Sequence, residues 1–412
     1  MSNTQTKNVP ELRFPGFEGE WEEKQLGEVT TQSMYGIGAS ATSFDSKNIY
    51  VRITDIDEKS RKLNYQNLTT PDVINNKYKL KRNDLLFART GASTGKSYIH
   101  KGEKDIYNYY FAGFLIKFEI NEQNSPLFIY QFTLTSKFNN WVKVMSVRSG
   151  QPGINSEEYA KLPLVLPNKL EQQKIGQLFS KFDRQIELEE QKLELLQQQK
   201  KGYMQQIFSQ ELRFKDENGE DYPEWEEKQL GEFADKVIQK NTDKKYTETL
   251  TNSAELGIIS QRDFFDKEIS NIDNIKNYYV VEENDFVYNP RISTYAPFGP
   301  VNRNKLGKKG VMSPLYTVFR IQNIDLNFIE FYFKSSKWYR FMALNGDSGA
   351  RADRFSIKDK TFMEMPLYIP CMDEQIKIGQ FFNNIDECIK SYKNKINILK
   401  KNKNGFLQKM FI

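Results

Sequence analysis

The sequence predicts an α+β protein in which two mixed α/β domains are separated by two long antiparallel helices. Three observations indicate this fold. The sequence repeats itself: EWEEKQLGE at 20–28 returns at 224–232, and EQQKIGQLF at 171–179 returns as EQIKIGQFF at 374–382. Each half begins with short β-branched and aromatic runs, and each ends in a proline-free stretch with one apolar stripe. The offset of 200–204 residues is too long for a solenoid and indicates a duplicated domain-plus-helix module with pseudo-two-fold symmetry.

The first domain is expected over residues 1–167. Its predicted strands are rich in β-branched and aromatic residues and are bounded by glycine, asparagine or proline: NIYVRITDI (48–56), DLLFART (84–90) and FAGFLIKFEI (111–120). The segment 128–145 has apolar residues at three- and four-residue spacing, which predicts a helix.

A long helix is predicted over residues 168–208. Asn168 with Glu171 three residues later is typical of a helix N-terminus. Apolar residues then follow in steps of three, four and seven: Ile175, Leu178, Phe179, Phe182, Ile186, Leu193, Leu196, Tyr203 and Ile207. A helix of this length would span roughly 60 Å, and its single apolar stripe needs a partner.

The second half repeats this order, with a domain over 209–370 and a helix over 371–412. Its predicted strands lie in 284–291 and 313–323, and 328–344 predicts a helix. The second long helix has the same stripe: Ile378, Phe381, Phe382, Ile385, Ile389, Ile396, Leu399, Phe406 and Met410. The two long helices are therefore expected to pack against each other.

Gly176 and Gly379 occupy equivalent places inside the two predicted helices. Glycine costs about 1 kcal/mol there relative to alanine, and a close backbone approach would explain it. The stripe fits two roles equally well: a helical hairpin that braces the protein, or one that measures a distance.

Composition limits the class of protein. The chain has 59 basic and 54 acidic residues, a net charge of +5, so any nucleic-acid surface must be local. Two cysteines without a CxxC pair fit a reducing cytoplasm. Neither a signal-peptide core nor an apolar run of membrane-spanning length is present, so a cytoplasmic protein without membrane contact is expected.

Motifs for catalysis are weak. The single histidine, His100, stands in a Lys-rich turn and is expected at the surface, which leaves little for histidine-based catalysis or zinc sites. GASTGKS (91–97) lacks the first glycine of a phosphate loop, since Thr90 is at that place. NPR (289–291) only faintly matches an amino-methyltransferase motif. DIDEK (55–59) is typical of a solvated turn.

Loops that carry arginine and glycine are stronger candidates. Arg89 follows a predicted strand of the first half, and Arg291 follows its counterpart in the second. Residues 148–151 and 348–354 precede the similar segments LPLVLP and MPLYIP. Arginine binds guanine edges or phosphates bidentately, and asparagine or glutamine reads adenine. One such residue is typical of any surface turn, but two equivalent pairs of loops indicate a bipartite contact surface.

The whole chain resembles the specificity subunit of type I restriction-modification enzymes. The resemblance rests on the order of domains and helices and on LPLVLP-x-x-x-EQQKIGQLF with its second copy, MPLYIP followed by EQIKIGQFF. It implies two target-recognition domains, each reading one half of an interrupted site in double-stranded DNA, with the helices holding them apart. Because the halves differ strongly between the shared blocks, the half-sites should differ.

The resemblance also implies partners. Two methyltransferase subunits would methylate adenine, and a restriction subunit that translocates DNA would cleave it. S-adenosylmethionine, ATP and Mg²⁺ would be bound by these partners, and the chain itself would hold no cofactor, metal or catalytic residue. The candidate DNA-binding residues are Arg52, Arg89, Ser93, Lys96, Arg148, Gln151, Asn155, Arg291, Ser293, Tyr295, Arg303, Arg351 and Arg354.

Two other classes remain open from the residues alone. One is a metal-dependent nuclease or ATPase with a coiled-coil dimerisation arm, which an acidic trio or a complete phosphate loop would favour. The other is a structural coiled-coil adaptor, which leaves the arginine loops unexplained.

Overall fold

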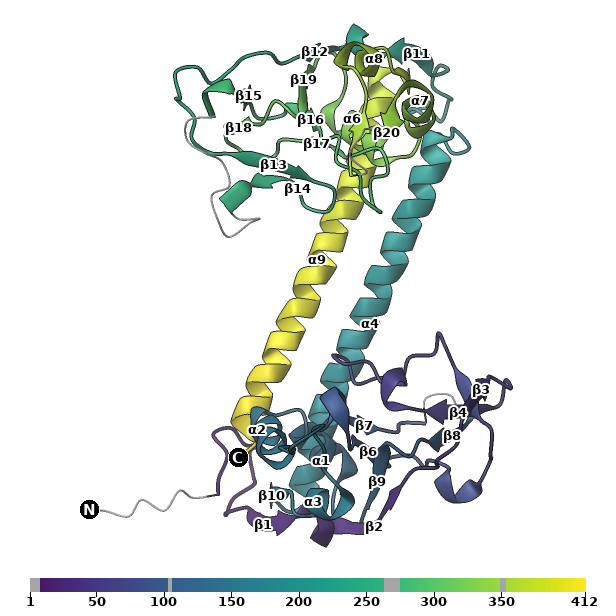
Figure 1. Ribbon diagram of the computed structural model, residues 1–412, viewed down its shortest axis with the longest axis vertical. Helices are drawn as coiled ribbons and strands as arrows, with labels where there is room; N and C mark the ends of the chain where they lie inside the picture. Colours follow the sequence, from purple (N-terminus) through teal and green to yellow (C-terminus); the bar gives the residue numbers. More distant parts are fainter. Residues whose placement is uncertain (1–7, 103–105, 263–274, 349–352) are drawn as a thin grey trace, which may run out of the picture. The chain divides into compact units, whose positions relative to one another are not determined.

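The computed structural model describes residues 8–102, 106–262, 275–348 and 353–412 (Figure 1). The chain forms two compact units. The first unit comprises Met1–Glu190 with Asn394–Ile412, and the second comprises Gln191–Lys393.

Both long helices are shared between the units: α4 (Lys169–Phe208) and α9 (Met372–Met410). Each unit therefore contains one globular domain and a part of each helix. The predicted boundaries at 167, 208 and 370 separate domains from helices instead. This finer division stays a prediction.

Four antiparallel strands form the main sheet of the first unit, in the order β2-β9-β6-β7. They are β2 (Thr30–Tyr35), β6 (Leu85–Ala88), β7 (Ser97–Ile99) and β9 (Leu115–Ile120). Beside them, β1 (Glu22–Gln25) pairs with β10 (Pro163–Leu166). The helices are α1 (Pro126–Phe132), α2 (Ser136–Met145) and α3 (Ser156–Ala160). Their shared core is aromatic, with Phe87, Phe118, Phe138 and Tyr159 buried.

A smaller lobe extends the first unit. Its strands are β3 (Ala41–Ser43), paired with β5 (Thr69–Pro71), and β4 (Asn48–Val51), paired in parallel with β8 (Asn108–Phe111). The unit also contains short 3₁₀ helices: η1 (Leu26–Val29), η2 (Ile53–Asp55), η3 (Asn76–Tyr78) and η4 (Gly91–Ser93).

Two elements predicted as continuous are divided. The predicted strand over 111–120 is split, because the chain turns after Phe111 and Leu115 N–H donates to Ala112 O at 2.8 Å. The predicted helix over 128–145 is broken between α1 and α2, where the Thr135 hydroxyl accepts a bond from Phe138 N and caps α2. Both errors have one cause, since apolar periodicity continues through a tight local turn.

The second unit repeats the main sheet in the order β12-β19-β16-β17. Its strands are β12 (Ala234–Lys236), β16 (Phe286–Tyr288), β17 (Val301–Arg303) and β19 (Thr317–Ile321), with β11 (Glu226–Gln229) paired to β22 (Pro366–Ile369). Its helices are α6 (Leu326–Lys334), α7 (Tyr339–Asn345) and α8 (Asp359–Met363), with η5 (Leu230–Glu232) and η6 (Ile275–Asn277). The helix predicted over 328–344 is thus also divided in two.

The smaller lobe of the second unit differs from that of the first. Its strands pair antiparallel, as β13 (Leu250–Ser253) with β14 (Gly257–Ser260), and β15 (Tyr279–Val281) with β18 (Gly310–Met312), and parallel pairing is reduced among the described residues to an isolated bridge between Thr249 and Val311. A short pair follows, β20 (Asp347–Ser348) with β21 (Phe355–Ser356). The duplication therefore preserves the main sheet and helices, while the smaller lobes have diverged.

The repeated sequence blocks build the junction between each domain and the start of its long helix. In the first unit, Arg13 donates two bonds, of 2.7 and 2.8 Å, to the fully buried carboxylate of Glu171. In the second unit, Arg213 binds the fully buried Glu374 in the same way. These pairs explain why the two halves keep the RF and EQ blocks.

The next residue of each block fastens the helix to the domain through backbone groups. Gln172 accepts a bond from Ser125 N and donates to Pro167 O, at 2.9 and 2.8 Å. Gln375 makes the same two bonds, with Asp325 N and Pro370 O, at the same distances.

The two glycines inside the helices lie at this junction. A Cβ on Gly176 would meet Leu127 Cβ at 2.9 Å and Phe128 N at 3.0 Å. A Cβ on Gly379 would meet Asn327 Cβ at 2.8 Å and Phe328 N at 3.1 Å. The expected close backbone approach is confirmed: each long helix crosses the first turn of a shorter one.

Within each unit, the parts of α4 and α9 run antiparallel. In the first unit, Asp183 pairs with Lys403 at 2.7 Å and Glu189 with Lys395 at 2.8 Å. In the second, Lys200 pairs with Asp386, the counterpart of Asp183. Some stripe residues pack across the two helices, as Phe182 does with Phe406 in the first unit and Tyr203 with Phe381 in the second.

The far end of each helix completes a core from the other half of the sequence. Leu407, Met410 and Phe411 are buried in the core of the first unit, beside α1 (Figure 1). Ile207 and Phe208 are buried in the core of the second.

The end of each long helix also makes an equivalent backbone hydrogen bond. Leu12 N donates to Lys409 O in the first unit, and Leu212 N donates to Gln206 O in the second.

His100 is buried, so its predicted surface position is wrong. Only 4% of the residue is exposed, its Nδ1 lies 3.2 Å from Tyr98 Oη, and its ring packs on Tyr109. A hydrogen-bonded imidazole ring is accommodated in such an aromatic cluster.

Candidate nucleic-acid interface

Arg89 is the centre of the candidate surface in the first unit. It follows β6, where its N–H donates to Phe114 O and its carbonyl accepts from Ile154 N. Its guanidinium lies over the ring of Tyr35, 5.0 Å from the centroid, and 5.7 Å from the centroid of Phe114. Both rings are partly exposed, 40% for Tyr35 and 59% for Phe114. The cation is thus held by two aromatic rings at the protein surface.

Three further predicted residues gather beside Arg89. The turn that carries Ser93 is bound to the loop of Gln151, since Gly91 N donates to Pro152 O at 2.9 Å. Gly91 is required there, because it has φ of +73° and a Cβ would meet the Gln151 amide at 2.8 Å. Asn155 caps α3, and the next amide, of Ser156, donates to Tyr35 Oη.

The other three predicted residues of this unit already have partners. Arg148 donates two bonds of 2.6 Å to the carboxylate of Glu158. Arg52 makes a two-bond pair with Asp55, and that hydrogen bonding raises the pKa of Arg52. Lys96 is 7% exposed and ends between Ile56 O and the Glu58 carboxylate.

In the second unit, predicted residues line a cavity of about 450 Å³. Arg291, Ser293 and Tyr295 form part of its rim, with Tyr295 72% exposed. Its lining includes the buried amide of Asn252, whose Nδ2 donates to Val287 O. Gln261 also lines it, and its Oε1 is buried without a hydrogen-bond partner among the described residues. These amides and tyrosines offer both donors and acceptors to a polar ligand.

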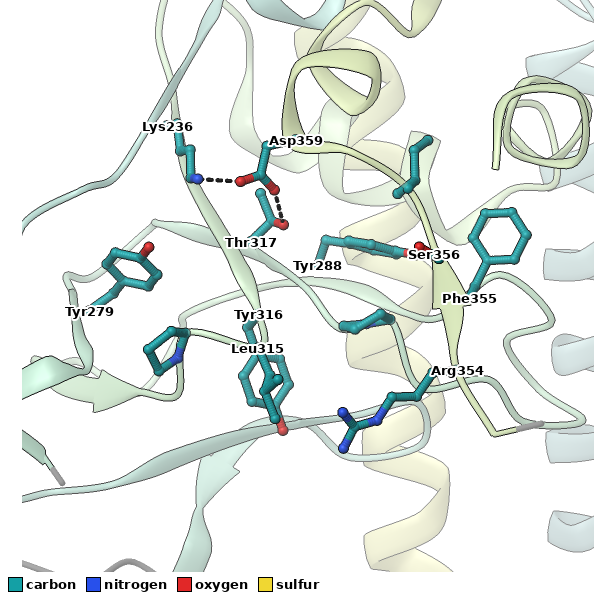
Figure 2. Close-up of a pocket in the computed structure, with 13 residues that line it drawn as sticks. Lys236, Tyr279, Tyr288, Leu315, Tyr316, Thr317, Arg354, Phe355, Ser356 and Asp359 are labelled. Atoms are coloured by element: carbon teal, nitrogen blue, oxygen red, sulfur yellow. Dashed lines mark hydrogen bonds and ion pairs between the residues drawn. The ribbon is translucent and has the colours of Figure 1, made fainter. Parts of the chain in front are cut away.

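A second cavity, of about 370 Å³, contains Arg354 (Figure 2). Lys236 and Asp359 form an ion pair in its wall, and the Thr317 hydroxyl donates to Asp359 at 2.8 Å. The hydrogen bond that Lys236 donates to Asp359 raises the pKa of Lys236, so this lysine is charged at neutral pH. Arg291 and Arg354 are bridged through their backbones, and each lines one of the two cavities.

Arg303 is a core residue. Its side chain is 8% exposed, and it binds the Glu330 carboxylate at 2.9 Å and Asn327 Oδ1 at 2.8 Å. Burial opposes ionisation of Glu330, but Lys334, Lys305 and Arg303 outweigh it and lower its pKa. Arg351 lies outside the described residues.

The strand registers revise how the two halves correspond. Leu85 pairs with Phe118 as Phe286 pairs with Phe319, a shift of 201 for both partners. The counterpart of Arg89 is therefore Pro290, and that of Arg291 is Thr90. The expectation that the two arginines occupy matching places is wrong by one residue.

Sequence reasoning missed Tyr35 and Phe114 in the first unit and Lys236 and Asp359 in the second. From the sequence alone, an aromatic residue next to a predicted strand is expected to belong to the hydrophobic core. The adjacency of the strands, which no local pattern gives, decides that these rings flank an arginine.

The described residues hold no group of three or more His, Cys, Asp or Glu side chains arranged to bind a metal. Likewise, none of the described helices combines the length and hydropathy needed to cross a bilayer.

Comparison with known proteins identifies the family. The sequence model of the type I restriction modification DNA specificity domain matches residues 18–198 and again residues 222–401. The chain belongs to this family. The two matches fall on the two halves of the repeat, so the chain carries the specificity domain twice.

Relatives cover most of the chain. It is 26% identical over 397 residues to the MjaX type I restriction enzyme specificity subunit of Methanocaldococcus jannaschii, covering 90% of this chain and 88% of that protein. The MjaVIII specificity subunit of the same organism is 23% identical over 334 residues, covering 77% and 75%.

A solved structure has the same fold. The crystal structure of the type I restriction-modification S subunit from M. genitalium matches with a TM-score of 0.59 at 14% identity, covering 98% of this chain and 99% of that one.

These matches confirm the predicted family, the α+β class and a DNA-specificity role rather than catalysis. The alternative of a nuclease or ATPase with a dimerisation arm has no support in them.

Proposed function

We propose that this chain is the DNA specificity subunit of a type I restriction-modification complex, in which each unit reads one half of a bipartite target. One observation carries the proposal: the same sheet occurs twice, with different side chains at its surface. The first unit presents an arginine between two aromatic rings. The second presents two cavities lined by Arg291 and Arg354. Two such surfaces suit two half-sites of different sequence.

The chemistry would be supplied by partners in the cytoplasm. Two methyltransferase subunits would bind S-adenosylmethionine and methylate adenine, and a restriction subunit would bind ATP and Mg²⁺. The modest net charge of +5 fits a chain whose partners supply part of the contacts with the DNA phosphates.

The test is to express the chain with a type I methyltransferase subunit and to map methyladenine in the host genome. We expect one interrupted motif with two different half-sites. Exchange of residues 20–165 for those of a relative should then alter one half-site and preserve the other. Absence of any chain-dependent motif, or a change in both halves after the exchange, would refute the proposal.

A further inference from the structure

At one equivalent surface position, the two units carry side chains of different chemical character. The registers make Phe114 the counterpart of Leu315, and Arg89 the counterpart of Pro290. Tyr35 corresponds to Ile238, because Ser33 and Lys236 pair with the equivalent Phe118 and Phe319.

Four of these six residues are large hydrophobic side chains with substantial exposure: 40% for Tyr35, 59% for Phe114, 73% for Ile238 and 57% for Leu315. Folding alone gives no reason to keep such residues in water at the same place twice.

Arg89 also differs from three of the other arginines predicted to bind DNA. Arg52, Arg148 and Arg303 are each neutralised by a carboxylate within hydrogen-bonding distance. Among the described residues, the side chain of Arg89 has neither an ion pair nor a hydrogen bond, and its Nε is buried without a partner. The two rings restrict the guanidinium, and its terminal Nη groups are the donors left for a ligand.

We propose that Tyr35, Arg89 and Phe114 form a clamp that reads a guanine in the major groove of the first half-site. The proposal rests on the function proposed above and names the group that sets one base. Guanine presents O6 and N7 side by side, and a fixed guanidinium fork donates to both, which is the commonest specific contact of arginine with DNA. The exposed ring faces can contact the neighbouring sugar or a thymine methyl group.

This assignment also explains why the two half-sites should differ. At the equivalent place the second unit has Ile238, Pro290 and Leu315, none of which can donate to a base from its side chain. Arg354, the counterpart of Gly153, comes from another loop and lines a cavity together with Pro290 and Leu315 (Figure 2). The guanine read by the clamp therefore has no equivalent in the second half-site.

The test uses the full chain in its methyltransferase complex, with methyladenine mapping as the readout. The variants are Arg89→Ala, Arg89→Lys and Phe114→Leu, the last of which introduces the residue found in the second unit. Arg82→Ala is the matched control, because it removes one exposed positive charge from the same unit away from the clamp.

We expect Arg89→Ala to relax one guanine of the first half-site, with discrimination against other bases reduced about 5- to 150-fold. The second half-site should stay unchanged, which also shows that the complex is folded. Arg89→Lys keeps the charge but loses the planar fork, so it should weaken preference at the same position. Phe114→Leu should act there too, more weakly, and Arg82→Ala should leave the motif intact.

Three results would overturn the clamp. An unchanged motif in Arg89→Ala shows that another group reads the first half-site. Methylation reduced equally at all sequences shows a phosphate contact instead of a base contact. Relaxation at a base other than guanine refutes the assignment of the base. If Arg89→Ala does not assemble, Arg89→Lys decides between these outcomes. A wild-type chain that directs no bipartite motif refutes the proposed function, whereas a normal wild-type motif with unaltered variants refutes the clamp alone.

Discussion

Replacing Phe411 by alanine should loosen the first globular domain, although this residue lies more than 240 positions from that domain's last strand. Phe411 is 5% exposed, and its ring contacts Phe128, Phe132 and Phe179 at centroid distances of 4.8, 6.3 and 5.8 Å. Truncation of a buried phenylalanine to alanine costs about 3–5 kcal/mol. At about 1.4 kcal/mol per factor of ten, opening of the first domain should become roughly 100- to 5000-fold more frequent.

Phe208 provides the matched control. It occupies the same place in the second unit, is 4% exposed, and stacks on Phe382 at 6.0 Å. Hydrogen–deuterium exchange on the full chain separates the two variants. Phe411→Ala should lower protection of the amides in β6 and β9, and Phe208→Ala that of β16 and β19. Equal loss in both units from either variant, or no loss from Phe411→Ala, would show that the end of α9 does not stabilise the first domain.

Three other predictions concern stability. Gly176→Ala should cost about 1–3 kcal/mol through overpacking against Leu127, whereas Gly202→Ala, with nothing within 4 Å, should be neutral or gain up to about 1 kcal/mol in denaturant unfolding. Arg303→Ala should destabilise the second unit by about 3–5 kcal/mol in the same assay, because it leaves Glu330 buried without this partner, and surviving complexes should keep the motif of the wild type. Because the folded pKa of Glu330 is lowered, its stabilisation is fully present above its unfolded pKa of about 4.3 and is lost as pH falls through the folded pKa. Glu330→Gln should therefore unfold more readily at neutral pH but lack this acid-dependent loss, which a pH series of thermal melts would detect.

The repeat and the apolar stripe predicted much of the fold, because both are properties of local sequence. Helix α4 runs over Lys169–Phe208, where the proline-free stretch predicts a helix. Gly176 and Gly379 indicated a close approach that the structure contains. The breaks between α1 and α2, and between β8 and β9, were missed because apolar residues continue through them.

The candidate site was harder to predict, because its residues come from separate segments. Tyr35, Arg89 and Phe114 lie together only because β2, β9 and β6 are neighbours in the sheet. Arg303 looked like a surface arginine, but its partner Glu330 follows 27 residues later on α6. An arginine's charge partner decides whether it faces a ligand or the core, and that partner is set by tertiary structure.

The dependence of the first core on the end of α9 has a consequence for synthesis on the ribosome. Residues of the first domain emerge well before Leu407 and Phe411, about 240 residues later, which at about 5–20 residues per second is a delay of roughly 10–50 s. The second domain has no such wait, since Ile207 and Phe208 precede it in the chain. The domain made first is thus the last to be finished. Until then we expect the faces of Phe128 and Phe179 that Phe411 covers in the folded protein to be exposed, which would favour chaperone binding to the nascent chain in that interval.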